Sequence, residues 1–173
     1  SNQYGMADAI GRWDHWGTGL VCTTVEEETV EGVLVLSPGD ILFPFERYVT
    51  EPLKIHFEKG LAHRLEGGRE AVMLRTMLDD RGDEGARRLS HVGWGIEHRA
   101  TWDTLSIRGW DNAGGVESRS CYGNVLMAIG ENRDLGGKNP SRLHIDMAFR
   151  STRLEIDGQP IVDCCKFLDK SVA

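Results

Sequence analysis

The sequence predicts an α+β fold, mainly antiparallel β-sheet with one or two packed helices. Three observations lead to this class: short apolar runs bounded by turn signals, a single segment with clear helical periodicity, and 21 glycines among 173 residues. Glycine at this level supplies many turns and close backbone approaches, which suits a β-rich chain better than a helix bundle. The length fits one domain, residues 1–173.

The first strands are predicted from runs that end at turns. Residues 29–36 (TVEGVLVL) are rich in β-branched residues and stop at a Ser-Pro-Gly-Asp turn signal. Residues 41–45 (ILFPF) are expected to resume as a strand, in which Pro44 indicates an edge or a break.

A hairpin is predicted next. Residues 53–57 alternate apolar and polar side chains, as a half-buried strand does. The turn residues Lys59 and Gly60 then lead into a second strand over residues 61–65.

The one good helix is expected over residues 69–80, with Gly82 as a plausible stop. The apolar residues of this segment recur at helical spacing: Ala71, Leu74 and Leu78, widened by Met73 and Met77. A methionine stripe at this spacing is more typical of core than of a cofactor site.

Strands are predicted again after the helix. The candidates are residues 89–95, 105–110, 123–129 and 142–149. The tail gives a last hairpin, in which Asp157 and Gly158 form a type I′ turn between residues 152–156 and 160–162.

Charge and cysteine usage narrow the function classes. Twenty basic and 27 acidic residues give a net charge of −7, which argues against a nucleic-acid binder, because such proteins carry basic patches. No run approaches the roughly 20 apolar residues of a membrane span, so no membrane association is expected. The four cysteines form no CxxC pair, and a disulfide framework is not expected; a reducing cytoplasm is the favoured compartment.

The pattern most suggestive of chemistry is Leu143-His144-Ile145-Asp146. On a strand, His144 and Asp146 share one face and are able to grip a divalent metal together. His91, in a His-Val-Gly-Trp-Gly run, is the candidate third ligand. Two histidines and a carboxylate match the facial triad of non-haem Fe(II) enzymes, and zinc also accepts this set. Taken singly, the His144–Asp146 spacing is more often an ordinary surface pair, and a lone His91 is more often a hydrogen-bonded core or turn histidine.

Two further segments are candidate pocket elements. Residues 122–133 resemble a strand that ends in a polar loop, where a ligand is often held, although an ordinary turn with solvated charges has the same pattern. Near the N-terminus, His15 between Trp13 and Trp16 is a candidate proton-transfer group, or part of an aromatic core.

In combination, the segments RWDHW, HVGWG, YGNVL, GEN, LHID and DGQPIV resemble the 2,5-dihydroxypyridine 5,6-dioxygenases of bacterial nicotinate catabolism. More distantly, they are similar to the aminopeptidase T superfamily. The resemblance runs from about residue 12 to residue 162. In that family this stretch is only the C-terminal, metal-binding half of a two-domain protein. Because the chain also opens with Ser-Asn-Gln and lacks an initiator Met, we expect a fragment of a longer protein.

The resemblance implies Fe(II) ligands at His91, His144 and Asp146, and an acid/base histidine at His15. It also implies a hydroxyl side chain near the metal, where this sequence has Ala128, which cannot ligate. A homo-oligomer is expected.

We therefore expect a ring-cleaving dioxygenase in which a hydroxypyridine and O₂ meet at Fe(II). From 2,5-dihydroxypyridine, the resemblance implies N-formylmaleamate as the product. Asn124 and Glu131 are assigned to substrate orientation, and Trp94 to the pocket wall. Two alternatives stay open: a metallopeptidase-like hydrolase, in which the metal activates water, and a non-catalytic metal-binding or assembly domain.

Overall fold

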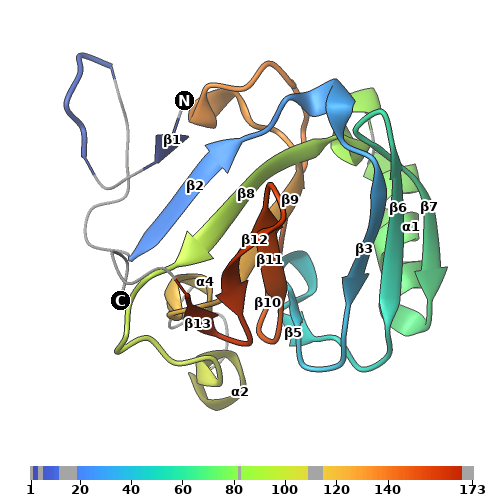
Figure 1. Cartoon of the computed structure of the whole chain (residues 1–173). Helices are drawn as coiled ribbons and strands as arrows, with labels where there is room; N and C mark the ends of the chain where they lie inside the picture. The colour runs from blue at the N-terminus through green and yellow to red at the C-terminus, as the bar shows by residue number, and fades with distance from the viewer. Residues whose placement is uncertain (1, 4–5, 12–18, 82, 109–114, 169–173) are drawn as a thin grey trace.

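Three antiparallel sheets make up most of the computed structural model, which describes residues 2–3, 6–11, 19–81, 83–108 and 115–168. The largest sheet has seven strands in the order β1-β2-β8-β9-β10-β4-β5 (Figure 1). Its strands are β1 (Asn2–Gln3), β2 (Leu20–Thr24), β4 (Ile41–Leu42), β5 (Arg47–Tyr48), β8 (Leu89–Gly95), β9 (Val125–Gly130) and β10 (His144–Phe149).

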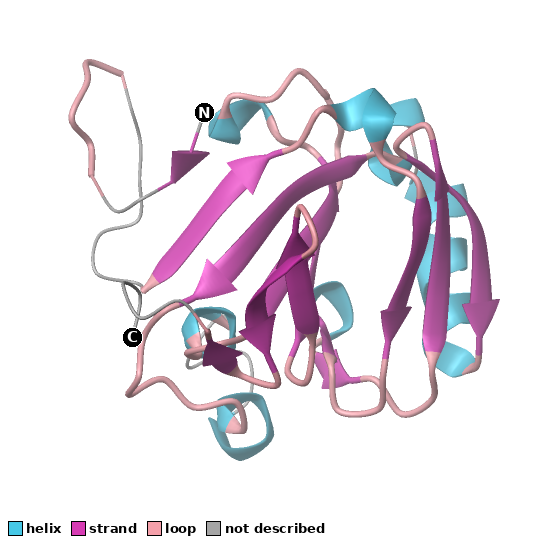
Figure 2. Ribbon diagram, viewed as in Figure 1, coloured by secondary structure: helices cyan, strands magenta, loops and turns pink. Residues whose placement is uncertain are grey.

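Two smaller sheets complete the strand content. One contains β3 (Gly32–Leu36), β6 (Leu53–Glu58) and β7 (Leu61–Gly67), and the other contains β11 (Arg153–Ile156), β12 (Gln159–Asp163) and β13 (Lys166–Phe167). The helices are α1 (Arg69–Arg81), α2 (Thr104–Arg108) and α4 (Val116–Ser120), with 3-10 turns at Glu27–Thr29, Phe43–Phe45, Glu84–Arg87 and Arg133–Leu135. Figure 2 shows α1 beside the β3-β6-β7 sheet. The predicted α+β class, with predominantly antiparallel strands, is confirmed.

The two faces of the seven-stranded sheet have different roles, as the alternation along β10 shows. Ile145, Met147 and Phe149 point into the larger core, which the sheet shares with β3, β6, β7 and α1. Ala148, on the opposite face, belongs to a smaller core whose buried members are Ile41, Phe43, Leu105, Leu126 and Ala148. His144 and Asp146 share the face of Ala148 and so lie outside the larger core.

Several sequence predictions are confirmed because they rest on local signals. The 53–65 hairpin forms as β6 and β7, and Lys59 and Gly60 both have positive φ (48° and 77°). The tail hairpin forms around Asp157 and Gly158 (φ 51° and 74°), as a type I′ turn requires. The predicted helix is present as α1, with Ala71, Leu74 and Leu78 buried.

Other predictions are wrong. The strand predicted over residues 105–110 is replaced, in its described part, by helix α2, which buries Leu105 in the smaller core. The strand predicted over residues 41–45 ends at Leu42, because a 3-10 helix begins at Phe43 with Pro44 in its first turn. The prediction missed β1, β2, β5 and β13, as well as α4.

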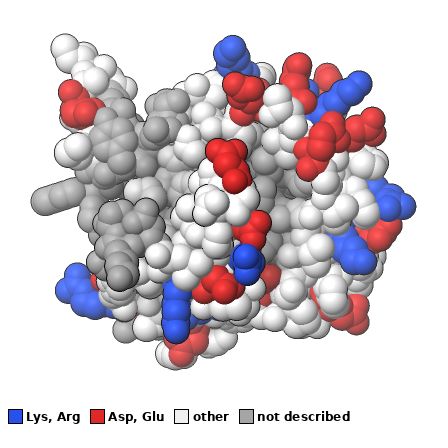
Figure 3. All heavy atoms as spheres, in the orientation of Figure 1, with Lys and Arg blue, Asp and Glu red and all other residues white. Residues whose placement is uncertain are grey.

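The structure also describes the state of the cysteines and the distribution of charged side chains on one face. All four cysteines are free thiols. Acidic and basic side chains are interspersed over the face drawn in Figure 3. Within the described ranges, no helix has both the length and the apolar character needed to cross a bilayer.

Candidate metal centre

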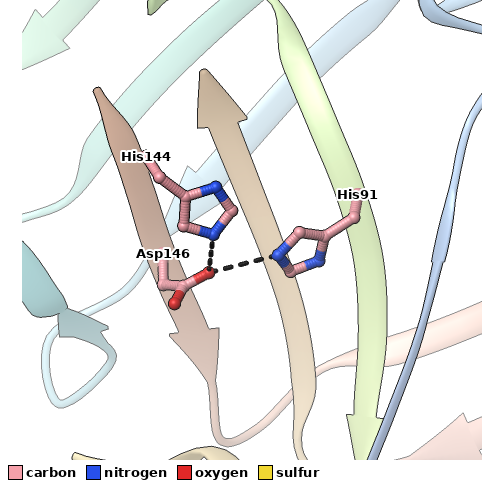
Figure 4. Close-up of side chains that lie close together, drawn as sticks. All are labelled: His91, His144 and Asp146. Carbon is pink, nitrogen blue, oxygen red and sulfur yellow. Dashed lines mark hydrogen bonds and ion pairs between the residues drawn. The ribbon is translucent and has the colours of Figure 1, made fainter. Parts of the chain in front are cut away.

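Strand register places one row of residues across three neighbouring strands. His91 on β8 lies opposite Ala128 on β9, and Ala128 lies opposite Asp146 on β10. Opposed residues of antiparallel strands project from the same face, and His144 joins them because it is two residues before Asp146. Figure 4 shows the three polar side chains converging from β8 and β10, with β9 between them.

The three side chains meet at one carboxylate oxygen. Asp146 Oδ1 lies 3.1 Å from His144 Nε2 and 3.3 Å from His91 Nε2. One ligand atom from each of the three residues lies within 4.8 Å of the others. His91 is buried, Asp146 is partly buried, and His144 is the most exposed of the three. The three predicted side chains therefore converge, and His144 is the one that reaches the solvent.

A backbone carbonyl orients His144. Its Nδ1 lies 2.7 Å from the carbonyl oxygen of Glu131, which also accepts a hydrogen bond from Ser90 Oγ at 2.9 Å. A carbonyl oxygen only accepts, so Nδ1 carries the proton and Nε2 is directed toward Asp146. A second hydrogen bond of this kind is typical of metal-bound histidines, because it fixes the ring orientation and the tautomer.

Electrostatics hold the carboxylate ionised. Burial alone would raise the pKa of Asp146, but hydrogen bonds from His144 and His91, together with the charges of His144 and Arg119, hold it well below its usual range. Burial would likewise lower the pKa of His144, but the Asp146 carboxylate outweighs burial and raises it. The Asp146 carboxylate therefore carries its negative charge beside the two imidazole rings.

The donor set fits a divalent metal. In the neutral ring with its proton on Nδ1, His144 Nε2 and the carboxylate oxygen 3.1 Å away are both acceptors, so the gap between them is bridged either by the second proton of the imidazolium or by a metal ion. Two imidazole nitrogens and one carboxylate oxygen are the ligands that Fe(II) or Zn(II) accepts. Nδ1 of His91 is buried and has no hydrogen-bond partner among the described residues. The ring can therefore carry its proton on Nδ1, which leaves Nε2 free to bind a metal.

Trp94 does not reach this site. It is three residues beyond His91 on β8, which is an odd number, so the two side chains leave opposite faces of the strand. Trp94 lies opposite Val125 and packs against the larger core. The predicted wall role is therefore not supported by its position.

Asn124 and Glu131 are engaged with the protein itself. Asn124 is fully buried, and among the described residues its amide bonds three backbone groups: the amide of Gly95 and the carbonyls of Ser118 and Arg119. The Glu131 carboxylate accepts hydrogen bonds from the backbone amides of Arg133 and Ser141 and from the Arg133 guanidinium. The Arg133 side chain contributes most to lowering the pKa of Glu131, to about 2. Both residues act as framework here, instead of orienting a substrate as predicted.

His15, the predicted proton-transfer residue, lies outside the described residues. Conversely, the sequence analysis missed Arg119, whose Nε donates to Asp146 Oδ2 at 2.9 Å. It also missed Ser90, although the position next to His91 was a signal that could have pointed to it. Nothing local in the sequence links Arg119 to Asp146, because 27 residues separate them.

Comparisons with known proteins identify the family. The family model for 2,5-dihydroxypyridine 5,6-dioxygenase, NicX, matches residues 1–169. A protein named 2,5-dihydroxypyridine 5,6-dioxygenase, from Pseudomonas putida KT2440, is 36% identical over 160 residues, covering 92% of this chain and 46% of its own length. The chain thus spans about half the length of the curated relative that it matches.

Solved structures agree as well. The structure of 2,5-dihydroxypyridine dioxygenase from Pseudomonas putida KT2440 superimposes with a TM-score of 0.89 and 34% identity, covering 98% of this chain and 49% of that one. Wild-type AmpT from Thermus thermophilus has a TM-score of 0.56 at 21% identity over 87% of this chain and 40% of that one. The second likeness is one of fold alone.

Proposed function

Because the chain belongs to the 2,5-dihydroxypyridine 5,6-dioxygenase family, we propose that it is the metal-binding part of an Fe(II)-dependent ring-cleaving dioxygenase. The proposed substrate is 2,5-dihydroxypyridine or a related hydroxypyridine, and the product from the former is N-formylmaleamate. The observation that carries the proposal is the convergence of His91, His144 and Asp146 on one face of the sheet.

In this proposal the three residues hold one Fe(II) through His91 Nε2, His144 Nε2 and Asp146 Oδ1. When bound, the iron would supply a redox-active centre with open positions at which an electron-rich ring and O₂ can react. The carbonyl of Glu131 keeps the His144 ring aimed at the centre. The methyl group of Ala128, between the two ligand strands, adds no fourth donor and leaves that side free for substrate.

The other parts of the proposal concern the rest of the protein. We propose that His15 moves protons during ring opening. Because this chain matches about half of each dioxygenase relative, we also propose that a second segment completes the pocket. A missing wall removes substrate orientation and water exclusion, so the 173-residue chain alone should be a poor catalyst. A cytoplasmic, homo-oligomeric enzyme is the proposed context.

The test combines metal analysis with turnover. Anaerobically purified protein is loaded with Fe(II), its metal content is measured, and loss of 2,5-dihydroxypyridine ultraviolet absorbance is followed under air. The assay is run on this chain and on a longer product containing the second segment. Stoichiometric iron in both, with fast turnover in the longer one, is the expected result. Paired zinc with peptide hydrolysis, or no turnover by either protein, would contradict the proposal.

A further inference from the structure

Arg119 contacts the side of Asp146 that faces away from the two histidines. Its Nε donates to Asp146 Oδ2 at 2.9 Å, whereas Oδ1 of the same carboxylate faces His91 and His144. The two carboxylate oxygens therefore have different partners. From this division we infer that Arg119 is a positioning residue, which restricts Asp146 to one metal-facing oxygen. The inference rests on the metal site proposed above.

The guanidinium group of Arg119 is held by an aromatic ring. Its Cζ lies 3.9 Å from the centroid of the Phe43 ring, a cation–π contact. Phe43 is 1% exposed and belongs to the smaller core, so the ring has a fixed position. The Arg119 side chain is itself only 18% exposed. Such a contact is stronger than one in open solvent, because the charge is partly desolvated.

The backbone of α4, which carries Arg119, is fixed by Asn124. A helix of five residues is not stable alone and needs tertiary contacts. Asn124 Nδ2 donates to the carbonyls of Ser118 and Arg119, at 2.8 Å each, while its Oδ1 accepts from the Gly95 amide of β8. A Cβ at Gly95 would overlap the Cys121 carbonyl and the Asn124 amide, so glycine is needed at this contact. The buried amide thus ties the helix to the ligand strand.

The contact between Arg119 and Asp146 affects how many coordination positions of a bound metal stay free. With Oδ2 engaged by Arg119, the described residues offer three ligand atoms at this site, so an octahedral ion held by these three alone would keep three positions for other ligands. A carboxylate free to rotate can bind through both oxygens, and the second oxygen would occupy one of those positions. Arg119 therefore preserves a position for substrate or O₂. An arginine that only neutralised the carboxylate would have no effect on this count.

The test counts exchangeable waters on Mn(II), a probe with similar octahedral preferences, by water-proton relaxation. Arg119→Met should lose about one third of the inner-sphere enhancement per bound ion, because Oδ2 replaces one of three waters. Arg119→Lys, which still places a donor and a charge near Oδ2, should keep the wild-type value. The matched control is Arg153→Met, which removes an arginine paired with Glu155 on β11 and should change nothing.

Wild-type enhancement in a folded Arg119→Met variant would overturn the inference. A second measurement does not depend on that variant folding: in a crystal structure of the Mn(II)-loaded wild type, Asp146 Oδ2 should bond Arg119 and not the ion. Bidentate Asp146 in that structure would also overturn it. A wild-type chain that binds no Mn(II) would instead overturn the metal site itself, and the inference with it.

Discussion

Asp146 has two roles, as the only anionic ligand of the proposed centre and as the ion-pair partner of Arg119, and two substitutions separate them. Asp146→Ala removes the carboxylate altogether. Asp146→Asn keeps the shape: its amide nitrogen can donate to Nε2 of a neutral His144 and its oxygen can accept from Arg119 Nε, so both contacts are kept, although the first one reverses its direction. Both variants lack the negative charge that a divalent ion needs.

Asp146→Ala and Asp146→Asn should differ in their loss of stability but should both lose most of their metal affinity. Removing one member of a buried pair costs about 3–5 kcal/mol; since the two side chains are 13% and 18% exposed, we expect the lower end. For a chain of this size, about 3 kcal/mol corresponds to a fall of roughly 6–12 °C in Tm for Asp146→Ala. Asp146→Asn should lose about 1 kcal/mol. Loss of a partner outside the ligand set costs ~10–100-fold in metal affinity, so both variants should lose more than about 100-fold.

The assay pairs thermal melts of the metal-free variants with anaerobic Fe(II) titration. Asp79→Asn is the control, because it alters another Asp–Arg pair whose aspartate side chain is 58% exposed and should affect neither measurement. Near-wild-type iron affinity in Asp146→Asn would refute the ligand assignment. An unchanged Tm in Asp146→Ala would refute the role given to the Arg119 pair.

Three further outcomes are expected. Because the pKa of Asp146 is lowered in the fold, its carboxylate stabilises the metal-free protein above about pH 4, and this stabilisation is lost as the pH falls through the lowered pKa. Because the pKa of His144 is raised, its imidazolium stabilises the protein below about pH 6.5, and this stabilisation is lost as the pH rises through the raised pKa. The urea midpoint of the metal-free protein should therefore be highest between these two pH values. Fe(II) affinity should rise with pH, because Nε2 of His144 must be deprotonated to bind the metal. A midpoint or an affinity that does not change with pH would contradict the corresponding expectation. Ala128→Ser should tighten Fe(II) binding about fivefold, the worth of one added polar contact, in the same titration, and unchanged affinity would argue that position 128 does not face the ion. Leu74→Ala, at a fully buried core site, should cost about 2–5 kcal/mol in urea unfolding with metal affinity intact, and a smaller cost would mean that α1 packs more loosely than the structure shows.

Local sequence signals determined the strands and turns that were predicted correctly. Lys59-Gly60 and Asp157-Gly158 fixed two hairpins, because a type I′ turn needs positive φ at both central positions and few residue pairs accept it. The spacing of Leu74 and Leu78 fixed α1 in the same way. Residues 105–110 were mistaken for a strand because so short an apolar run fits either period, and packing against the smaller core decided for α2.

The candidate site also has features that the sequence predicts and features that only the tertiary structure shows. His144 and Asp146 could be paired from sequence, since residues two apart on a strand share a face. By the same rule, Trp94 could have been excluded from the pocket, because it is an odd number of residues from His91. The convergence of His91 with the other two required the register of β8 on β9 and of β9 on β10. The contact of Arg119 with Asp146 required the docking of α4. The alternation of side chains between the two faces is a property of a single strand and can be predicted from its own residues. The register between strands and the docking of α4 depend on contacts between distant segments, which only the tertiary structure decides.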